Sequence, residues 1–375
     1  MRRVIALLLA LMLGTTGCLS AGDVADYAFV LSFGIERGDT FAYRIVLLVA
    51  MPKAGGEDGA TLDTGVYSAE ARTLYEAIET LNAGMPLRLR FSRVSLILLS
   101  EPLLREGRIG ELLDFSLGAL DIHSNVRMMA AHGDLKEIYE ALQSDADPSF
   151  SKSMQNIDAL DTHAGTVIDA RCRAVWEALG AAPFDLVLPC IGVGEPDLLP
   201  DAVGGEAYPK RGGALVQSSA NDASVIGSAV FDGARMVGTL SGLHTQLVGM
   251  VRGDFHEGQM TLYHPEHGTV SVRLRLRRAS VSLEAVALSL EATVLYPLAA
   301  GEDDALGPWL ASETERGLTE TFAALKDLNA DAMGFGRFDA MQHPFAVTED
   351  WKARYPAISP SFAVEVRLLR SGGAA

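Results

Sequence analysis

The order of apolar and polar residues predicts a first half in which strands and helices alternate. Two runs rich in Val, Ile, Phe and Tyr cover residues 26–36 and 43–51, and Gly38-Asp39 between them predicts a β-hairpin. Glycine and acidic residues predict a loop over 53–64. The apolar spacing then predicts further helices and strands, namely helices over 68–82 (capped by Ser68), 102–120 and 134–142 and strands over 94–99 and 126–131. This order predicts a mixed sheet covered by helices.

The composition of the middle of the chain predicts a domain boundary. Helical spacing covers residues 158–179, a strand-like run covers 184–191, and a Gly-, Pro- and acid-rich stretch follows over 192–213. We therefore divide the sequence into four parts, which are a signal peptide over 1–17, an N-terminal domain over 18–200 with a possible division near 145–158, a linker over 201–222 and a C-terminal domain over 223–371.

In the second half, strands dominate the pattern. Residues 227–231 and 235–240 flank Asp232-Gly233, which is typical of a tight hairpin turn. Further elements are predicted as a helix over 241–251, strands over 259–263, 269–277 and 281–296, a long helix over 303–328 and a final strand over 362–368. In residues 269–277 the apolar positions alternate with arginines, so the two sets lie on opposite faces. We expect an α+β chain of mixed α/β domains in a row, with a C-terminal antiparallel sheet packed by a long helix.

Composition narrows the classes of function. The chain has 375 residues, of which 49% are hydrophobic, so it can bury a large core. Its net charge of −17 argues against nucleic acid as a partner and against electrostatic adhesion to an anionic membrane. The most apolar later stretch, residues 281–300, is interrupted by Glu284 and Glu291, and we read it as strand.

The N-terminus has the pattern of a secretory signal. Arg2 and Arg3 precede an apolar run over residues 4–13, and small residues lead to Cys18. Ten apolar residues are too few to span a bilayer of roughly 30 Å. The pattern predicts cleavage before Cys18, acylation of its thiol and a mature protein outside a cytoplasmic membrane. An ordinary signal peptide with a chance cysteine is the alternative.

The sequence indicates no reaction centre. Cys172 and Cys190 lack zinc-site spacing, and one disulfide or two buried thiols both remain open. Three histidines, His256, His264 and His267, lie near each other, but the last two flank a predicted turn, where exposed histidine is common. No serine has a Gly-x-Ser-x-Gly context, and no glycine-rich phosphate loop precedes a helix. We therefore expect no catalytic residue, no metal site and no cofactor.

Three stretches carry a family resemblance. The first contains Asp23-Val24, Tyr27-Ala28-Phe29-Val30 and Gly34-Ile35. The second runs from Gly227 to Phe231 and from Met236 to Leu240, and the third joins Asn329–Gly336 to Trp351 and Tyr355-Pro356. In these motifs the chain resembles the Ger(x)C family, the lipoprotein C subunits of spore germinant receptors. It departs from the family at Leu19-Ser20, where Trp-Asp is usual, and at Glu36, where Asp is usual.

The resemblance implies a function. It implies a lipid-anchored subunit on the extracytoplasmic face of the spore inner membrane, beside integral-membrane A-type and B-type subunits. Such a subunit takes part in nutrient-triggered germination through protein contacts and has no enzymatic activity. Two other classes stay open, a lipid-anchored solute-binding protein that acts alone and an extracytoplasmic hydrolase.

The motif residues are expected to be fold determinants, with partner contact at the Gly-Phe-Gly turn as the alternative. They are Gly227, Phe231, Gly238, Asp331, Gly334, Phe335, Gly336 and Trp351. We expect Gly334 to end the long helix with a positive φ and Phe335 to fill the space beneath it. We expect Trp351 to anchor the final strand rather than to bind a ligand.

Overall fold

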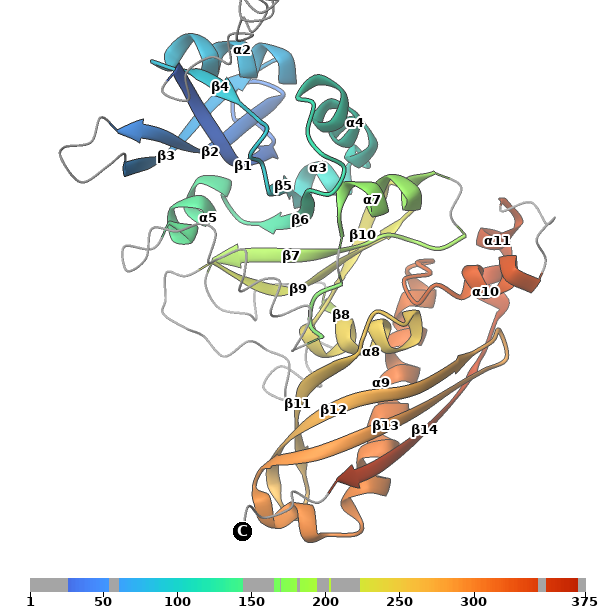
Figure 1. Cartoon of the computed structure of the whole chain (residues 1–375). Helices are drawn as coiled ribbons and strands as arrows, with labels where there is room; N and C mark the ends of the chain where they lie inside the picture. The colour runs from blue at the N-terminus through green and yellow to red at the C-terminus, as the bar shows by residue number, and fades with distance from the viewer. Residues whose placement is uncertain are drawn as a thin grey trace, which may run out of the picture.

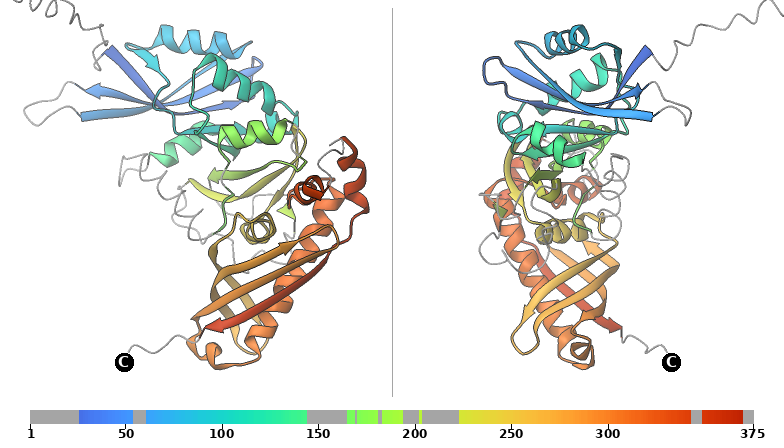
Figure 2. Two further views of the ribbon diagram at one scale, coloured as in Figure 1. Left: turned by 45° about the vertical axis from the view of Figure 1, so that its right-hand side comes forward. Right: turned by 90° about the vertical axis from the view of Figure 1, so that its left-hand side faces the viewer.

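The structure, a computed structural model, consists of two sheets at opposite ends of an elongated molecule (Figures 1 and 2). It describes residues 26–53, 61–143, 165–168, 170–180, 183–193, 202–203, 223–342 and 349–369. We call the ten-stranded sheet sheet A and the four-stranded sheet sheet B. The predicted fold class is confirmed, since a mixed N-terminal sheet with helices is followed by a C-terminal sheet with a long helix. The signal peptide and Cys18 lie outside the described residues.

Sheet A combines an antiparallel meander with a parallel centre. Its main path runs in the order β3-β2-β1-β5-β6-β7-β9-β10-β8, and β4 pairs with β1. Its first strands are β1 (Tyr27–Glu36), β2 (Tyr43–Lys53), β3 (Thr61–Ala71), β4 (Arg88–Arg90), β5 (Leu96–Ser100), β6 (Arg127–His132) and β7 (Val187–Val193). Every residue of β5 is buried, with Ile97 in the core on one side and Leu98 in the core on the other. Covered on both faces, the parallel strands are therefore continuous apolar runs.

The helices of the first half differ from the predicted ranges. They are α2 (Leu74–Gly84), α3 (Glu101–Arg105), α4 (Ile109–Asp114), the π turn η2 (Phe115–Ala119), α5 (Leu135–Leu142) and α7 (Cys172–Leu179). The predicted helix over 68–82 is wrong at its start, because β3 pairs with β2 along its whole length and Thr73, not Ser68, caps α2. The predicted helix over 102–120 is interrupted, because Gly107 takes a φ of +80° between α3 and α4.

Helix α7 and strand β7 each contain one of the two internal cysteines. Of the helix predicted over 158–179, only the part in α7 is helical among the described residues, and residues 158–164 lie outside them. Cys172 and Cys190 are buried free thiols, so no disulfide joins them. Burial raises the pKa of the Cys172 thiol to about 11, which keeps it protonated and unreactive at neutral pH.

The predicted hairpin forms, but it belongs to sheet A. Strands β9 (Ala223–Asp232) and β10 (Arg235–Leu240) are joined by a turn in which Gly233 has a φ of +58°. Strand β9 also pairs antiparallel with β7, and the short β8 (Ala202–Val203) lies parallel to β10. The N-terminal sheet is thus completed by strands that we had grouped with the C-terminal half. Most of the predicted linker lies outside the described residues, and the division into domains stays a prediction.

Sheet B is a mixed sheet with one face covered by helices (Figure 1). Its strands are β11 (Glu257–His264), β12 (Gly268–Val281), β13 (Ala285–Tyr296) and β14 (Ser361–Leu369). The first three are antiparallel as predicted, whereas β14 pairs parallel with β13. The reason is that the chain returns through a crossover before it enters β14. The helical elements of this half are α8 (Gly242–Arg252), η5 (Leu298–Glu302), α9 (Leu306–Asp327), α10 (Phe335–Gln342), α11 (Glu349–Arg354) and η6 (Tyr355–Ala357).

The core of the second half lies between sheet B and its helices. Leu247 of α8 and Leu318 of α9 belong to one apolar cluster with Val272 and Leu290 of the sheet. Within the described part of the chain, no helix has both the length and the apolar character needed to cross a bilayer.

Candidate functional site

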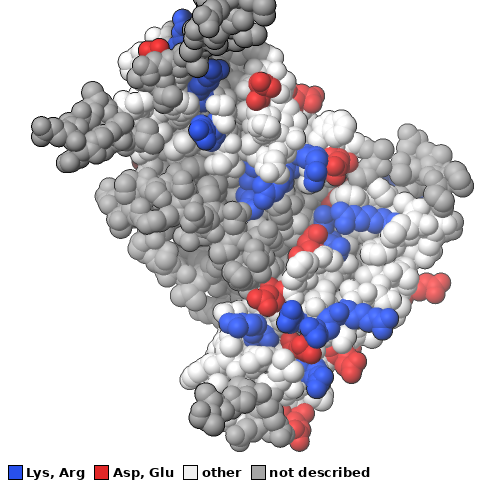
Figure 3. All heavy atoms as spheres, viewed as in Figure 1, with Lys and Arg blue, Asp and Glu red and all other residues white. Residues whose placement is uncertain are grey.

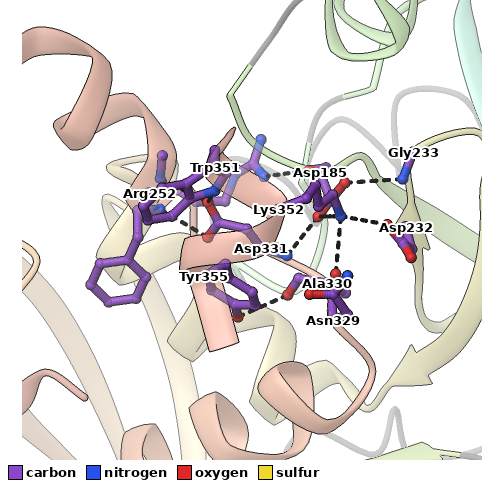
Figure 4. Close-up of polar contacts among 12 residues, drawn as sticks. Asp185, Asp232, Gly233, Arg252, Asn329, Ala330, Asp331, Trp351, Lys352 and Tyr355 are labelled. Atoms are coloured by element: carbon purple, nitrogen blue, oxygen red, sulfur yellow. Dashed lines mark hydrogen bonds and ion pairs between the residues drawn. The ribbon is translucent and has the colours of Figure 1, made fainter. Parts of the chain in front are cut away.

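Five segments that are distant in sequence meet between the two sheets in a cluster of polar side chains (Figure 4). They are the residues before β7, the end of β9, the end of α8, helix α11 with η6, and a segment that we call the loop 329–336, which follows α9 and includes the first two residues of α10. We call this group the junction cluster and define it as Asp185, Asp232, Arg252, Asp331, Trp351, Lys352 and Tyr355. Four of these residues, Asp185, Asp331, Trp351 and Tyr355, are almost completely buried.

The carboxylate of Asp331 is the centre of the loop 329–336. Its Oδ1 accepts a hydrogen bond from the backbone N–H of Phe335 (2.9 Å). Its Oδ2 accepts from the N–H of Gly336 (2.8 Å) and from Nε1 of Trp351 (3.0 Å). The pKa of Asp331 is raised to about 7, chiefly by burial and also by the nearby Asp185, while the three donors act in the opposite direction.

Asp185 binds the same loop through a reciprocal pair of contacts. The backbone N–H of Asp185 donates to the carbonyl of Asp331 (3.1 Å), and the N–H of Asp331 donates to Oδ2 of Asp185 (2.7 Å). The other carboxylate oxygen of Asp185 accepts from the N–H of Gly233 in the β9–β10 turn (3.0 Å). One side chain therefore fixes the loop to the end of sheet A.

Lys352 of α11 binds three of the other segments. Its Nζ donates to Oδ2 of Asp185 (2.5 Å), to Oδ1 of Asp232 (2.5 Å) and to the carbonyl of Asn329 (2.9 Å). Asp185 is buried, and leaving such a charge without its partner costs several kcal/mol. The ammonium group therefore compensates a carboxylate that sheet A could not bury alone.

Two further donors satisfy carbonyls of the loop. The hydroxyl of Tyr355 donates to the carbonyl of Ala330 (3.0 Å), and Nη1 of Arg252 donates to that of Ala332 (3.0 Å). Arg252 lies at the end of α8, so the helix that packs under sheet B also binds the loop. Buried backbone groups need such partners, and the cluster supplies them from fixed elements.

The glycines of the loop have separate roles. Gly334 has a φ of +78°, as expected, but the prediction that it ends the long helix is wrong. Helix α9 ends at Asp327, and Asn329 follows with a φ of +51°, a conformation that asparagine adopts readily. At Gly336 a Cβ atom would lie 1.6 Å from the carbonyl oxygen of Pro183, so no larger residue fits. Phe335 is fully buried against Phe322, as we predicted for the space beneath the turn.

The second motif adjoins the cluster. Phe231 is fully buried in β9, and the next residue, Asp232, binds Lys352. Gly227 has a φ of +145° and lies opposite Cys190. A Cβ at Gly238 would lie 2.8 Å from the side chain of Leu328, just after α9. The two C-terminal motifs are thus neighbours in space.

The structure also shows what the sequence reasoning missed. Trp351 donates a hydrogen bond to Asp331, and its expected role as an anchor of the final strand stays a prediction. Asp185, Arg252 and Lys352 were not singled out. The available signals were weak, an aspartate at the start of an apolar run and a lysine beside the motif tryptophan. Of the first motif, Tyr27–Val30 and Gly34-Ile35 lie in β1, away from the cluster (Figure 1), and Asp23-Val24 lie outside the described residues.

A group of metal-ligand types occurs at the β11–β12 turn. His264 and His267 meet Asp303 rather than His256, with candidate ligand atoms within 4.8 Å of one another. Contrary to the expectation of an exposed turn, His264 is buried, and its Nδ1 accepts from the N–H groups of Glu266 (3.1 Å) and His267 (3.2 Å). Nε2 of His267 bonds Oδ2 of Asp303 (2.8 Å). The group is thus hydrogen-bonded internally, and the absence of a metal site stays a prediction.

Comparisons with known proteins agree along the length of the chain. A family model described as the spore germination protein N-terminal domain matches residues 21–193, and one described as spore germination B3/GerAC-like, C-terminal, matches residues 226–294. Spore germination protein KC of Bacillus subtilis (strain 168) is 23% identical over 393 residues, which cover 95% of this chain and 92% of that protein. The crystal structure of the GerBC protein matches with a TM-score of 0.51 and 12% identity over 90% of this chain and 96% of that one, which shows a shared fold.

Proposed function

Because this chain belongs to the GerAC-like family of spore germination proteins, we propose that it is the C-type subunit of a germinant receptor. The observation that carries the proposal is the extent of the likeness, which covers 95% of the chain and 92% of a spore germination protein. In this role the protein takes part in nutrient-triggered germination beside integral-membrane A-type and B-type subunits.

The junction cluster supports a role through protein contacts. Its motif residues are buried and bonded to one another, so their side chains are engaged in holding the loop 329–336. The same contacts fix sheet B to sheet A. A body of two firmly joined sheets is suited to presenting a constant surface to other subunits, and we assign the protein no reaction centre of its own.

We assign the membrane attachment to a lipid on Cys18, on the extracytoplasmic face of the spore inner membrane. Small residues precede Cys18, and buried acyl chains contribute about 0.8 kcal/mol per methylene to membrane binding. Labelled fatty acid is expected to be incorporated into the wild-type chain and into a Cys172→Ala control, but not into Cys18→Ala. A Cys18→Ala chain labelled at the wild-type level would contradict the anchor.

Deletion of the gene in the parent spore-former tests the receptor role. Spores are exposed to a panel of amino acids and sugars, and germination is measured as the loss of optical density of the spore suspension. We expect a slower response to at least one germinant, restored by the wild-type gene, with the response to the other germinants as the internal control. Unchanged germination with every germinant, after related receptors are also deleted, would contradict the proposal. Tight binding of a germinant by the isolated chain would favour the solute-binding alternative.

A further inference from the structure

Sheet B has one face that the helices leave exposed. Along β13 and β14 the residues alternate between more exposed and more buried, and along β12 they do so as far as Arg277. The buried set, which includes Val272 and Leu290, packs in the apolar cluster of α8 and α9. The other set forms the surface that we call the outer face, whose main side chains are Tyr263, Arg273, Arg275, Arg278, Tyr296 and Arg367.

The charge of the outer face is opposite to that of the whole chain. The chain carries −17, but the four strands contain five arginines, no lysine and three glutamates. The pairing register places Arg275 between Glu257 and Glu291 and places Arg367 beside Glu291. Arg273 and Arg278 have neutral cross-strand neighbours. Figure 3 shows the resulting band of basic side chains across the lower part of the molecule, over sheet B.

The residue types on this face are those of protein interfaces. Arginine and tyrosine are enriched at the residues that carry most binding energy, whereas lysine is depleted. Tyr263 is 54% exposed and Tyr296 is 64% exposed at one end of the face. Small residues such as Ala287 and Ala363 lie on the same face.

The edges of sheet B are bonded to side chains from the helices. Nε2 of Gln246 in α8 donates to the carbonyl of Gln259 in the edge strand β11 (2.9 Å). At the other edge, the N–H of Val364 in β14 donates to Oε1 of Glu315 in α9 (2.7 Å). Occupied edge groups disfavour the addition of a further strand, so a partner is expected to meet sheet B at its face.

We propose that the outer face of sheet B docks an acidic surface of another protein subunit in the receptor complex. The proposal rests on the function proposed above and names the surface that this function uses. Guanidinium groups bind carboxylates in a bidentate geometry, and the excess of arginine on the outer face complements a partner rich in Asp and Glu. An anionic membrane is not the expected occupant, because β1, which follows the proposed anchor, lies at the opposite end of the molecule (Figure 2).

The test uses charge reversal in the full chain. Arg273→Glu combined with Arg278→Glu leaves the strands free of new like-charge pairs, because the facing residues Gln259, Thr293 and Ser289 are neutral. The control, Arg37→Glu combined with Arg72→Glu, makes the same change of charge at side chains that are 67% and 78% exposed beside sheet A. Each tagged chain is purified from solubilised membranes of the parent spore-former, and the A-type and B-type subunits are quantified by mass spectrometry.

We expect at least a tenfold loss of co-purified subunits with the sheet B variant and wild-type recovery with the control. If the wild-type chain recovers neither subunit, the proposed function fails. If the wild type recovers them and the sheet B variant does so equally well, the function stands and the docking surface is wrong. Equal circular dichroism spectra and urea midpoints are required of both variants.

A second measurement does not depend on charge or on stability. Tyr296 is replaced by the photo-crosslinker p-benzoylphenylalanine, with the equally exposed Tyr75 beside sheet A as the control position. Irradiation is expected to join position 296, but not position 75, to a receptor subunit. A crosslink from position 296 to a second copy of this chain would overturn the proposal in favour of self-association. Charge-dependent binding of the outer face to phosphatidylglycerol vesicles, without such a crosslink, would overturn it in favour of a membrane.

Discussion

Sheet A and sheet B differ in the burial of neighbouring residues along a strand. In β5 of sheet A every residue is buried, because apolar cores lie on both sides. In β13 of sheet B buried and more exposed residues alternate, and on β12 the outward set includes arginines. A sheet enclosed on two sides can serve only as a framework, whereas a sheet covered on one side keeps a surface for contact.

The junction cluster fixes the orientation of sheet B, and so of its exposed face, relative to sheet A. Asp185, just before β7 of sheet A, is buried and forms an ion pair with the partly exposed Lys352 of α11, and Asp331 completes the contact through its backbone. A partner can bind such a face in a defined geometry only if the orientation of the face is constant. The contacts between the sheets provide that orientation, and four experiments test the difference between the sheets and the contacts that join them.

The largest effects are expected from alanine substitutions at consecutive positions. In β5, Ile97→Ala and Leu98→Ala should each lower the free energy of unfolding by about 2–5 kcal/mol, because each side chain leaves a cavity in a different core. In β12, Leu274→Ala should cost a similar amount, whereas Arg273→Ala should change the value by less than about 0.5 kcal/mol. Urea unfolding, monitored by circular dichroism, measures the free energy of unfolding of all four variants. A cost above about 2 kcal/mol for Arg273→Ala would mean that the outer face is packed.

A pH effect is expected at the junction between the sheets. The pKa of Asp331 is raised from 3.8 to about 7, so between these values the folded chain holds a proton that the unfolded chain has released. The contribution of this group to stability is therefore complete below about pH 4 and is lost as the pH rises through 7. At about 1.4 kcal/mol per pKa unit, the loss amounts to at most about 4 kcal/mol.

The matched variant for this effect is Asp331→Asn, which cannot titrate. The free energy of unfolding is measured with urea at about pH 5 and at about pH 8. Between these two values it should fall less for the variant than for the wild type. The variant is less stable at both values, because an amide offers one acceptor oxygen to three donors. An identical pH dependence in both proteins would exclude Asp331 as its source.

A smaller effect is expected from one methyl group at the same junction. Gly336→Ala places a Cβ 1.6 Å from the carbonyl oxygen of Pro183, so the backbone has to move, at a cost of about 1–3 kcal/mol. Gly84→Ala in α2 is the control, since no atom lies within 4 Å of its Cβ position and alanine favours a helix. Thermal unfolding compares the two variants. Equal midpoints would show that the junction is less tightly packed than the structure indicates.

The smallest effect is expected at an edge of sheet B. Glu315→Ala removes the acceptor of the N–H of Val364 and should cost about 1 kcal/mol, because the site is partly solvated. Glu320→Ala, on the same helix and bound to Arg316 at the surface, should cost less than about 0.5 kcal/mol. Unfolding in urea gives both values, and analytical ultracentrifugation tests for strand pairing at the opened edge. Self-association by Glu320→Ala but not by Glu315→Ala would contradict the assignment.

Local patterns predicted much of the fold. The alternation over residues 269–277 placed the arginines of β12 on the correct face, and Asp232-Gly233 located the β9–β10 turn. The helix assigned from Ser68 failed because its residues also suit a strand, and the long pairing with β2 decides between the two states. The direction of β14 depends on the path of the crossover, which no local pattern encodes.

The junction cluster was predictable only in part. The motif Asp331, Phe335, Gly336 and Trp351 stands out in the sequence, and its members do meet in space. Asp185 lies 146 residues before Asp331, and nothing near it in sequence indicates a partner. Contacts of this kind arise from tertiary packing, and a single sequence contains no record of which distant residues pair.

The pairing of β9 with β7 has a consequence for the order in which the protein can be made. A ribosome releases β7 before β9. The edge of β7 that pairs with β9 therefore stays unpaired until the residues from Ala223 onward have been synthesised. Until then its backbone groups are open to any other strand nearby. A chain truncated between Val193 and Ala223 would keep that edge permanently, and we expect it to precipitate rather than to accumulate as a smaller folded protein.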